Sequence, residues 1–200
     1  MAMSYYDEDY YMTGNKSGYG GVYFPYTDIQ MLRLEPMAKT TFNWLHPKTT
    51  LELGCARGYF TRALRNLGIE SYGIDISTWA IEHGDSQVKQ FLKQGDITVC
   101  LGDYKDREFD LVTAVDVLEH IEKTKLPKTI DHICRIAKRN ILVQVPIIDN
   151  GRDGSHVSIL PDSWWKTQFT MHKFKIFGSQ IKKETDGITN FAVIFERKPQ

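Results

Sequence analysis

The sequence predicts an α/β fold: an open, seven-stranded, mostly parallel sheet with helices on both faces and an antiparallel last strand. Two observations lead to this prediction. From residue 49 onward, short apolar runs typical of buried strands alternate with segments whose apolar residues recur at helical spacing. The last two runs, residues 173–181 and 191–198, are joined by a connection too short for a helical crossover. The final strand is therefore expected to run antiparallel.

Each expected element has its own signal in the chain. The five strands expected before the final pair are residues 49–54, 71–77, 97–103, 109–116 and 140–147. Five helices are expected: at 27–45, from 60 to 68, between the second strand and about Gln94, at 126–137 and at 161–169. Pro36 should break or kink the first of these helices, and Gly68 should be the C-cap of the second. Pro127 fits the first turn of the fourth helix. Asp186 and Gly187 are a turn pair between the last two strands.

The bulk composition fits a globular protein and argues against several function classes. Hydrophobic residues make up 42% and charged residues 25% of the 200 residues. Lys+Arg and Asp+Glu both number 25, so no global field attracts nucleic acid or an anionic membrane. No apolar run approaches the roughly 18 residues that a membrane span needs. The acidic, aromatic N-terminus is unlike a signal peptide, and the three cysteines lack CxxC spacing, so we expect a reducing, cytoplasmic setting.

The stretch "LELGCARGYF", residues 51–60, reads as a strand that enters a glycine-containing loop and then a helix. Ligands of open α/β sheets bind beyond the carboxyl ends of the strands, so this loop is a natural binding site. No GxxxxGK[ST] phosphate loop is present. Aligned on Gly54, a dinucleotide GxGxxG loop would have Ala56 and Tyr59 at its second and third glycines. The third glycine lets the helix pack closely on the strand, so the tyrosine disfavours NAD.

The same loop fits the pattern [DE]-x-G-x-G-x-G as Glu52, Gly54, Ala56 and Gly58. In this it resembles motif I of class I S-adenosylmethionine-dependent methyltransferases, and the resemblance covers roughly residues 49–198. Their cofactor carries a sulfonium and an ammonium but no phosphate, so a nearby carboxylate attracts it. Ala56 is expected to have either a negative φ or a mild strain on the order of 1 kcal/mol.

Further cofactor contacts follow from the strand ends. Asp75, followed by Ile76, ends the second predicted strand, where a carboxylate can accept hydrogen bonds from ribose hydroxyls. The resemblance implies that Asp103, at the end of the third predicted strand, contacts the adenine amino group and that Tyr104 lies against the ring. "FDLVTAVDVLEHI" resembles the family's fourth strand and the turn after it, and we include Val115 from this segment in the predicted cofactor site.

Catalysis by such an enzyme depends mainly on holding the acceptor in line with the methyl group, and a hydroxyl acceptor also needs a base. His120 and His156 are the candidate bases, although Glu119 and His120 are also typical of a purely structural corner. Some methyltransferases that act on RNA or on ubiquinone precursors bind a divalent ion through E-x-x-E-H. Here the motif begins with the shorter Asp116, and D-x-L-E-H also occurs in members without metal, so we predict no metal site.

The N-terminal region, residues 1–48, is predicted to form an aromatic lid and helical segment before a methyltransferase domain at 49–200. It contains seven of the ten tyrosines, namely Tyr5, Tyr6, Tyr10, Tyr11, Tyr19, Tyr23 and Tyr26. Tyrosines offer apolar faces and hydroxyl groups to a ligand. A partly disordered tail is the alternative, although aromatic residues are depleted in such tails.

The acceptor follows only in outline. A [DNS]PP[YFW] motif of nucleobase enzymes is missing after the fourth strand, and nothing in the sequence supports a nucleic acid acceptor. We therefore expect methyl transfer to an O or N atom of a small molecule, carbohydrate, lipid or peptide, and the sequence does not indicate an oligomeric state. The alternatives are a metal-assisted RNA or catechol-type O-methyltransferase and an inactive, cofactor-binding partner protein.

Overall fold

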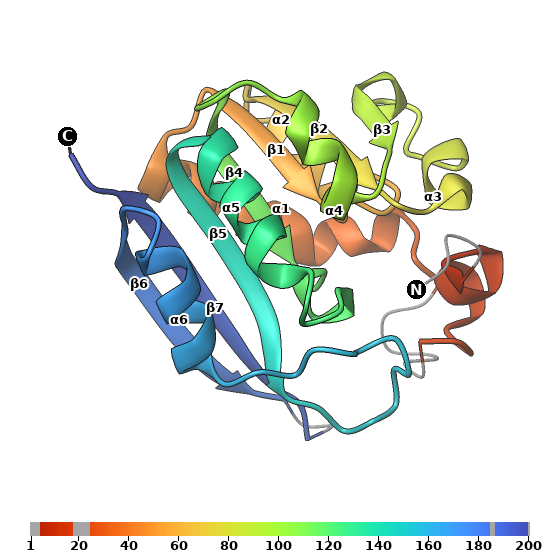
Figure 1. Ribbon diagram of the computed structural model, residues 1–200. Coiled ribbons are helices and arrows are strands. Elements are labelled where there is room, and N and C mark those ends of the chain that lie inside the picture. The colour runs from red at the N-terminus through yellow and green to blue at the C-terminus, as the bar shows by residue number, and fades with distance from the viewer. Residues whose placement is uncertain (1–4, 18–24, 185–186, 200) are drawn as a thin grey trace. The chain divides into compact units, whose positions relative to one another are not determined.

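The computed structural model describes residues 5–17, 25–184 and 187–199, which belong to two compact units, Met1–Ile97 and Thr98–Gln200. The seven strands follow the order β3-β2-β1-β4-β5-β7-β6 (Figure 1). This mostly parallel sheet with antiparallel β5-β7-β6 pairing confirms the predicted fold class. The domain boundary predicted at residue 48 stays a prediction. None of the helices in the described residues is long and apolar enough to cross a membrane.

The first unit contains three parallel strands. They are β1 (Thr49–Leu53), β2 (Glu70–Asp75) and β3 (Leu92–Gln94), with helices α1 (Met31–Leu45), α2 (Tyr59–Arg65) and α3 (Thr78–Glu82) and the short helical turns η2 (Asp9–Thr13), η3 (Asp28–Gln30) and η4 (Lys89–Phe91). Leu51 and Leu53 of β1 and Ile74 of β2 are fully buried. Thr50 and Ser71, whose side chains face the other side of the sheet, are equally buried, as expected for parallel strands covered on both faces.

The second unit contains the antiparallel part of the sheet. Its strands are β4 (Phe109–Val115), β5 (Ala137–Ile148), β6 (Phe174–Lys183) and β7 (Thr189–Arg197), and its helices are α5 (Leu126–Ile136), α6 (Asp162–Thr170) and the turns η5 (Leu101–Asp103) and η6 (Leu118–His120). Pro127 lies in the first turn of α5, as predicted. The ring of Phe169 on α6 stacks on Phe195 of β7 at 4.6 Å, which holds this helix against the sheet (Figure 1).

The third strand is where the sequence prediction was wrong. Residues 97–103 form α4 (Ile97–Cys100) and the turn η5, and the strand is the three-residue segment Leu92–Gln94. Ile97 and Leu101 are buried while Val99 is 75% exposed, so the apolar residues follow helical spacing. A short apolar run fits either structure by pattern alone. The helix predicted up to about Gln94 accordingly ends at Glu82.

The N-terminal helix begins later than predicted and does not break at Pro36. Helix α1 continues from Met31 to Leu45 without ending at Pro36, which only lacks the N–H that would bond the carbonyl of Leu32. One face of α1 packs on α2 through a cluster that includes Leu34, Ala38 and Leu64. The predicted tyrosines Tyr19 and Tyr23 and the turn residue Asp186 lie outside the described residues, whereas Gly187 has the positive φ of 94° expected in a turn.

Candidate functional site

The loop between β1 and α2 turns back through three residues of positive φ. They are Gly54 at 71°, Ala56 at 48° and Gly58 at 80°. A side chain on Gly58 would also meet Leu92, because its Cβ would lie 2.7 Å from a Leu92 methyl group. The alanine therefore occupies a conformation that favours glycine, which confirms the mild strain expected at this position and amounts to about 1 kcal/mol.

Asp75, at the end of β2, is the carboxylate that this loop surrounds. The backbone N–H of Ala56 donates to Oδ2 at 2.7 Å, and the backbone N–H of Ser77 donates to Oδ1 at 2.8 Å. The Tyr11 hydroxyl donates a third hydrogen bond. Burial raises the pKa of Asp75 above its ordinary value, and these three bonds act in the opposite direction. Asp75 is thus a buried carboxylate whose charge is stabilised by the loop predicted to bind cofactor.

Glu52 has a structural partner in the first turn of α2. Its Oε2 accepts from the backbone N–H of Thr61 at 2.9 Å and from the Thr61 hydroxyl at 2.6 Å. Burial raises the pKa of Glu52 to about 8, while the bonds from Thr61 favour the ionised form. The carboxylate therefore caps the helix that follows the loop, and this contact accounts for an acidic residue here even without a ligand.

The structure does not place Asp103 and Tyr104 at a strand end. Asp103 ends the turn η5, and the Tyr104 carbonyl accepts a hydrogen bond from Arg135 at 2.7 Å. The Tyr104 ring packs edge-on against Phe109 at 5.5 Å, and burial raises its pKa to about 12. The roles predicted for these two residues depended on a strand at 97–103, which the structure contradicts.

The acidic residue that does follow the third strand, Asp96, is not among the predicted cofactor residues. Asp96 comes two residues after β3, and the N–H of the intervening Gly95 donates to the Asp75 backbone carbonyl at 2.8 Å. The signal was present as "QGD" at residues 94–96, a glycine–aspartate pair that a three-residue strand precedes. Of the other predicted cofactor residues, Ile76 follows β2 and Val115 ends β4.

A cluster of tyrosines covers Asp75 within the first unit. The Tyr11 ring stacks on Trp79 at 5.7 Å with an interplanar angle of 12°, and both pack near Ala56 and Ala80. The Tyr6 carbonyl accepts from the Ser77 hydroxyl. Asp75 and Tyr11 are consequently only 5% and 6% exposed.

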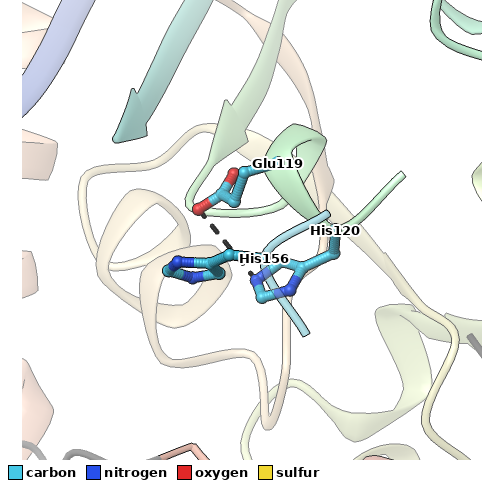
Figure 2. A group of neighbouring side chains, drawn as sticks. All are labelled: Glu119, His120 and His156. Carbon is cyan, nitrogen blue, oxygen red and sulfur yellow. Dashed lines mark ion pairs between the residues drawn. The ribbon is translucent and has the colours of Figure 1, made fainter. Parts of the chain in front are cut away.

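The second unit brings together the two predicted catalytic histidines. Glu119 and His120 come from η6, and His156 comes from the loop after β5 (Figure 2). The Glu119 carbonyl accepts from the backbone N–H groups of Val157 at 3.0 Å and Ser158 at 2.9 Å, which fastens the loop to the turn. The two imidazole rings lie 4.9 Å apart.

The environment of these side chains is dry and acidic. Burial, then the neighbouring His156, lowers the pKa of His120 below its ordinary value, so this imidazole is neutral at pH 7. His120 Nδ1 lies 2.8 Å from the Ser155 hydroxyl, and His156 has Asp149 at 3.3 Å and Asp153 at 3.8 Å. Burial raises the pKa of Glu119 well above its ordinary value.

Asp116, the first residue of the D-x-x-E-H motif, has a different partner. Its two carboxylate oxygens accept from the Gln144 side-chain amide at 3.1 and 3.2 Å. Among the described residues, the group whose ligand atoms all lie within 4.8 Å of one another contains Glu119, His120 and His156. The structure thus separates the motif into a buried cluster and an acidic residue bound to β5.

The strand order, and a glycine loop whose backbone binds the carboxylate ending β2, are together typical of a Rossmann-like methyltransferase. A family model described as a methyltransferase domain matches residues 32–192. The chain belongs to this family.

Individual relatives agree with this assignment. The chain is 32% identical over 116 residues to a ubiquinone biosynthesis O-methyltransferase of Alkalilimnicola ehrlichii, a match that spans 55% of the chain and 44% of the relative. The fold is similar to magnesium protoporphyrin IX methyltransferase of Synechocystis with bound S-adenosylhomocysteine (TM-score 0.72, 16% identity, 96% and 98% coverage of the two chains). It is also similar to a SAM-dependent methyltransferase of Archaeoglobus fulgidus (TM-score 0.70, 16% identity, 84% and 94% coverage).

Proposed function

We propose that the protein binds S-adenosylmethionine and transfers its methyl group to a hydroxyl of a small-molecule acceptor. The observation that carries this proposal is the buried Asp75 carboxylate, to which the loop after β1 donates the Ala56 N–H at 2.7 Å. A carboxylate fixed in this way beside a glycine turn is suited to accept hydrogen bonds from ribose hydroxyls. The O-methyltransferase named among the relatives supports the choice of oxygen as acceptor atom.

The cofactor-binding residues in this proposal are Glu52, Gly54, Ala56, Gly58, Asp75, Ile76 and Val115. We assign the adenine contact to Asp96 and its neighbour Ile97 in place of Asp103 and Tyr104, because Asp96 follows β3. Glu52 lies in the strand before the loop, and its hydrogen bonds from Thr61 fix the start of α2 next to the proposed cofactor site.

We propose that the acceptor loses its proton near His120 and His156. The methyl transfer itself needs in-line positioning and exclusion of water. Burial lowers the pKa of His120, which makes its imidazole a neutral but weaker base, so His120 alone contributes little to proton removal. We also propose a reducing, cytoplasmic setting, in which Cys55, Cys100 and Cys134 form no disulfide with one another.

Two measurements test this function. Isothermal titration of the full chain with S-adenosylhomocysteine should show one binding site, and Asp75→Asn should weaken it strongly. Release of S-adenosylhomocysteine from S-adenosylmethionine should then be stimulated by phenols and catechols more than by amines. Binding without any turnover on this panel, on carbohydrates or on lipid extracts would favour the inactive partner protein, and absence of binding would refute the proposal.

A further inference from the structure

Helix α1 carries exposed apolar side chains on the side opposite to its contact with α2. The buried side of the helix belongs to a core cluster of the first unit. On the other side, Leu32 is 79% and Trp44 61% exposed, and Ile29, in the turn η3 directly before the helix, is 60% exposed. An exposed helix side normally carries polar residues, and a single exposed apolar residue needs no explanation. Three large ones along one helix, however, form a surface that is suited to a partner.

These residues lie in one stripe along the helix, which we call the α1 stripe. Exposed residues follow one another at intervals of three or four positions, namely Ile29, Leu32, Pro36, Thr40 and Trp44. This spacing brings them to the same side of a helix. The stripe extends along most of α1, whose 15 residues span about 22 Å. The Thr40 hydroxyl donates to the Pro36 carbonyl at 2.9 Å, so a partner can cover the middle of the stripe without leaving this hydroxyl unpaired.

Two opposite charges border the α1 stripe. Glu35 and Lys39 are exposed and lie four positions apart, on the same edge of the stripe. Neither side chain forms an ion pair in the parts of the chain that the structure describes, although Glu and Lys at this spacing commonly pair within a helix. Both charges are therefore available to an opposite charge on a partner.

A second copy of this chain has the complementary arrangement. A two-fold axis that passes α1 near Pro36 makes the two helices antiparallel and brings the same edge of each helix together. Ile29 of one copy then lies beside Trp44 of the second copy. Glu35 of one copy lies about two residues, or about 3 Å of helix rise, from Lys39 of the second copy. Symmetry repeats each contact, so the interface has an ion pair on both sides of the axis and apolar contacts at both ends.

We propose that the α1 stripe is the interface of a homodimer with antiparallel α1 helices. Ile29, Leu32 and Trp44 are buried there against the second copy, and Glu35 pairs with Lys39 of the second copy. A single pair of helices of this length buries less area than the roughly 1,600 Å² of a standard protein interface. The dimer is therefore weak and reversible, with a dissociation constant on the order of 10–100 µM. This proposal does not rest on the proposed methyl transfer.

Charge reversal on α1 tests both the occupant of the stripe and its orientation. Sedimentation equilibrium of the full chain should show a monomer–dimer equilibrium. Glu35→Lys and Lys39→Glu each place like charges across the axis, so each should weaken dimerisation about 10-fold. An equimolar mixture of the two variants has opposite charges across the axis in the heterodimer. It should dimerise within about threefold of the wild type, and so should the double variant, in which the two charges are exchanged.

A second pair of variants tests the apolar part of the stripe. Leu32→Gln should weaken dimerisation by about 10-fold or more, because each dimer loses two buried leucine side chains. Met171→Gln is the matched control, since Met171 is 72% exposed and lies in the second unit. It should leave the dissociation constant unchanged. Unfolding temperatures equal to that of the wild type would show that both variants are folded.

Four outcomes would overturn the proposal. They are a chain that stays monomeric up to about 1 mM, equal weakening in Leu32→Gln and Met171→Gln, and a mixture of the charge variants that dimerises no better than either variant alone. The fourth is a monomeric chain that binds phosphatidylglycerol vesicles and loses this binding in Leu32→Gln, since it would identify a lipid surface as the occupant of the α1 stripe. Weakening in the single charge variants that the mixture reverses would confirm the antiparallel homodimer.

Discussion

Two buried carboxylates, Asp75 in the first unit and Glu119 in the second, have opposite hydrogen-bonding environments. Asp75 accepts from two backbone N–H groups and from Tyr11, whereas neither oxygen of Glu119 has a hydrogen-bond partner among the described residues. Both are at most 5% exposed. Burial alone therefore does not describe a site. A satisfied carboxylate positions a polar ligand, while an unsatisfied one among imidazoles is suited to a cation.

The largest effect is expected from Asp75→Asn. The two backbone donors bond different oxygens of Asp75, so an amide necessarily presents N–H groups to one of them. We expect S-adenosylhomocysteine to bind about 100-fold more weakly and the free energy of unfolding to fall by about 1–3 kcal/mol. Calorimetry and urea denaturation measure the two quantities. Unchanged values for both would mean that the bonds to Asp75 stabilise neither the fold nor the ligand.

Glu119→Leu should have the opposite sign in metal-free protein. Replacing a buried, unpartnered carboxylate by an apolar side chain removes a desolvation cost, so the free energy of unfolding in EDTA should rise by about 1–3 kcal/mol. Urea denaturation of the wild type and Glu119→Leu in EDTA measures the difference. A destabilised Glu119→Leu protein in EDTA would show that Glu119 has a stabilising partner.

The sequence alone predicts some features of the cofactor site in the first unit and not others. The pairing of Gly54 and Gly58 with Asp75 was predictable, because a glycine loop between a strand and a helix has few ligands and few conformations. The short β3 was not, since Leu92–Gln94 has three residues and no apolar run, while Ile97 and Leu101 fit a strand or a helix equally well.

The second site could be predicted only in part. His120 and His156 were predicted as candidate bases, but a sequence does not show which carboxylate of a D-x-x-E-H motif is buried. In the structure, Asp116 accepts a hydrogen bond from Gln144, whereas the Glu119 carboxylate lies beside His120 and His156. Similarly, Tyr11 and Asp75 are far apart in the chain, and a local sequence pattern does not predict that they contact each other.

The corrected adenine contact can be tested by a pair of matched substitutions. Asp96 follows β3 in the same unit as Asp75, whereas Asp103 ends the turn η5 in the other unit. Asp96→Asn should weaken S-adenosylhomocysteine about 10-fold, the loss of one charged hydrogen bond. Asp103→Asn should leave the affinity unchanged. The reverse result, measured by the same titration, would restore the assignment first made from the sequence.

Glu52 predicts a pH dependence of stability. Burial raises its pKa from the ordinary 4.5 to about 8, so the folded protein holds this proton to higher pH than the unfolded chain does. Between these values the free energy of unfolding should fall as pH rises, with a contribution of at most about 1.4 kcal/mol per pH unit. Glu52→Gln should remove this contribution while keeping an oxygen for Thr61. Denaturation of both proteins at pH 5.5 and 8.5 gives the difference, and parallel curves would contradict the raised pKa.

The smallest effect concerns the strain at Ala56, whose N–H serves Asp75. In Ala56→Gly the φ of 48° becomes favourable, which gains about 1 kcal/mol, but a buried methyl group is lost from the tyrosine cluster, which costs about 0.8 kcal/mol. The net change in the free energy of unfolding should lie close to zero. Ala63→Gly, in the interior of α2, has no strain to relieve and should lose about 1–2 kcal/mol. Equal losses in the two variants, measured by urea denaturation, would show that the loop holds Ala56 without strain and that its second positive-φ position does not require a glycine.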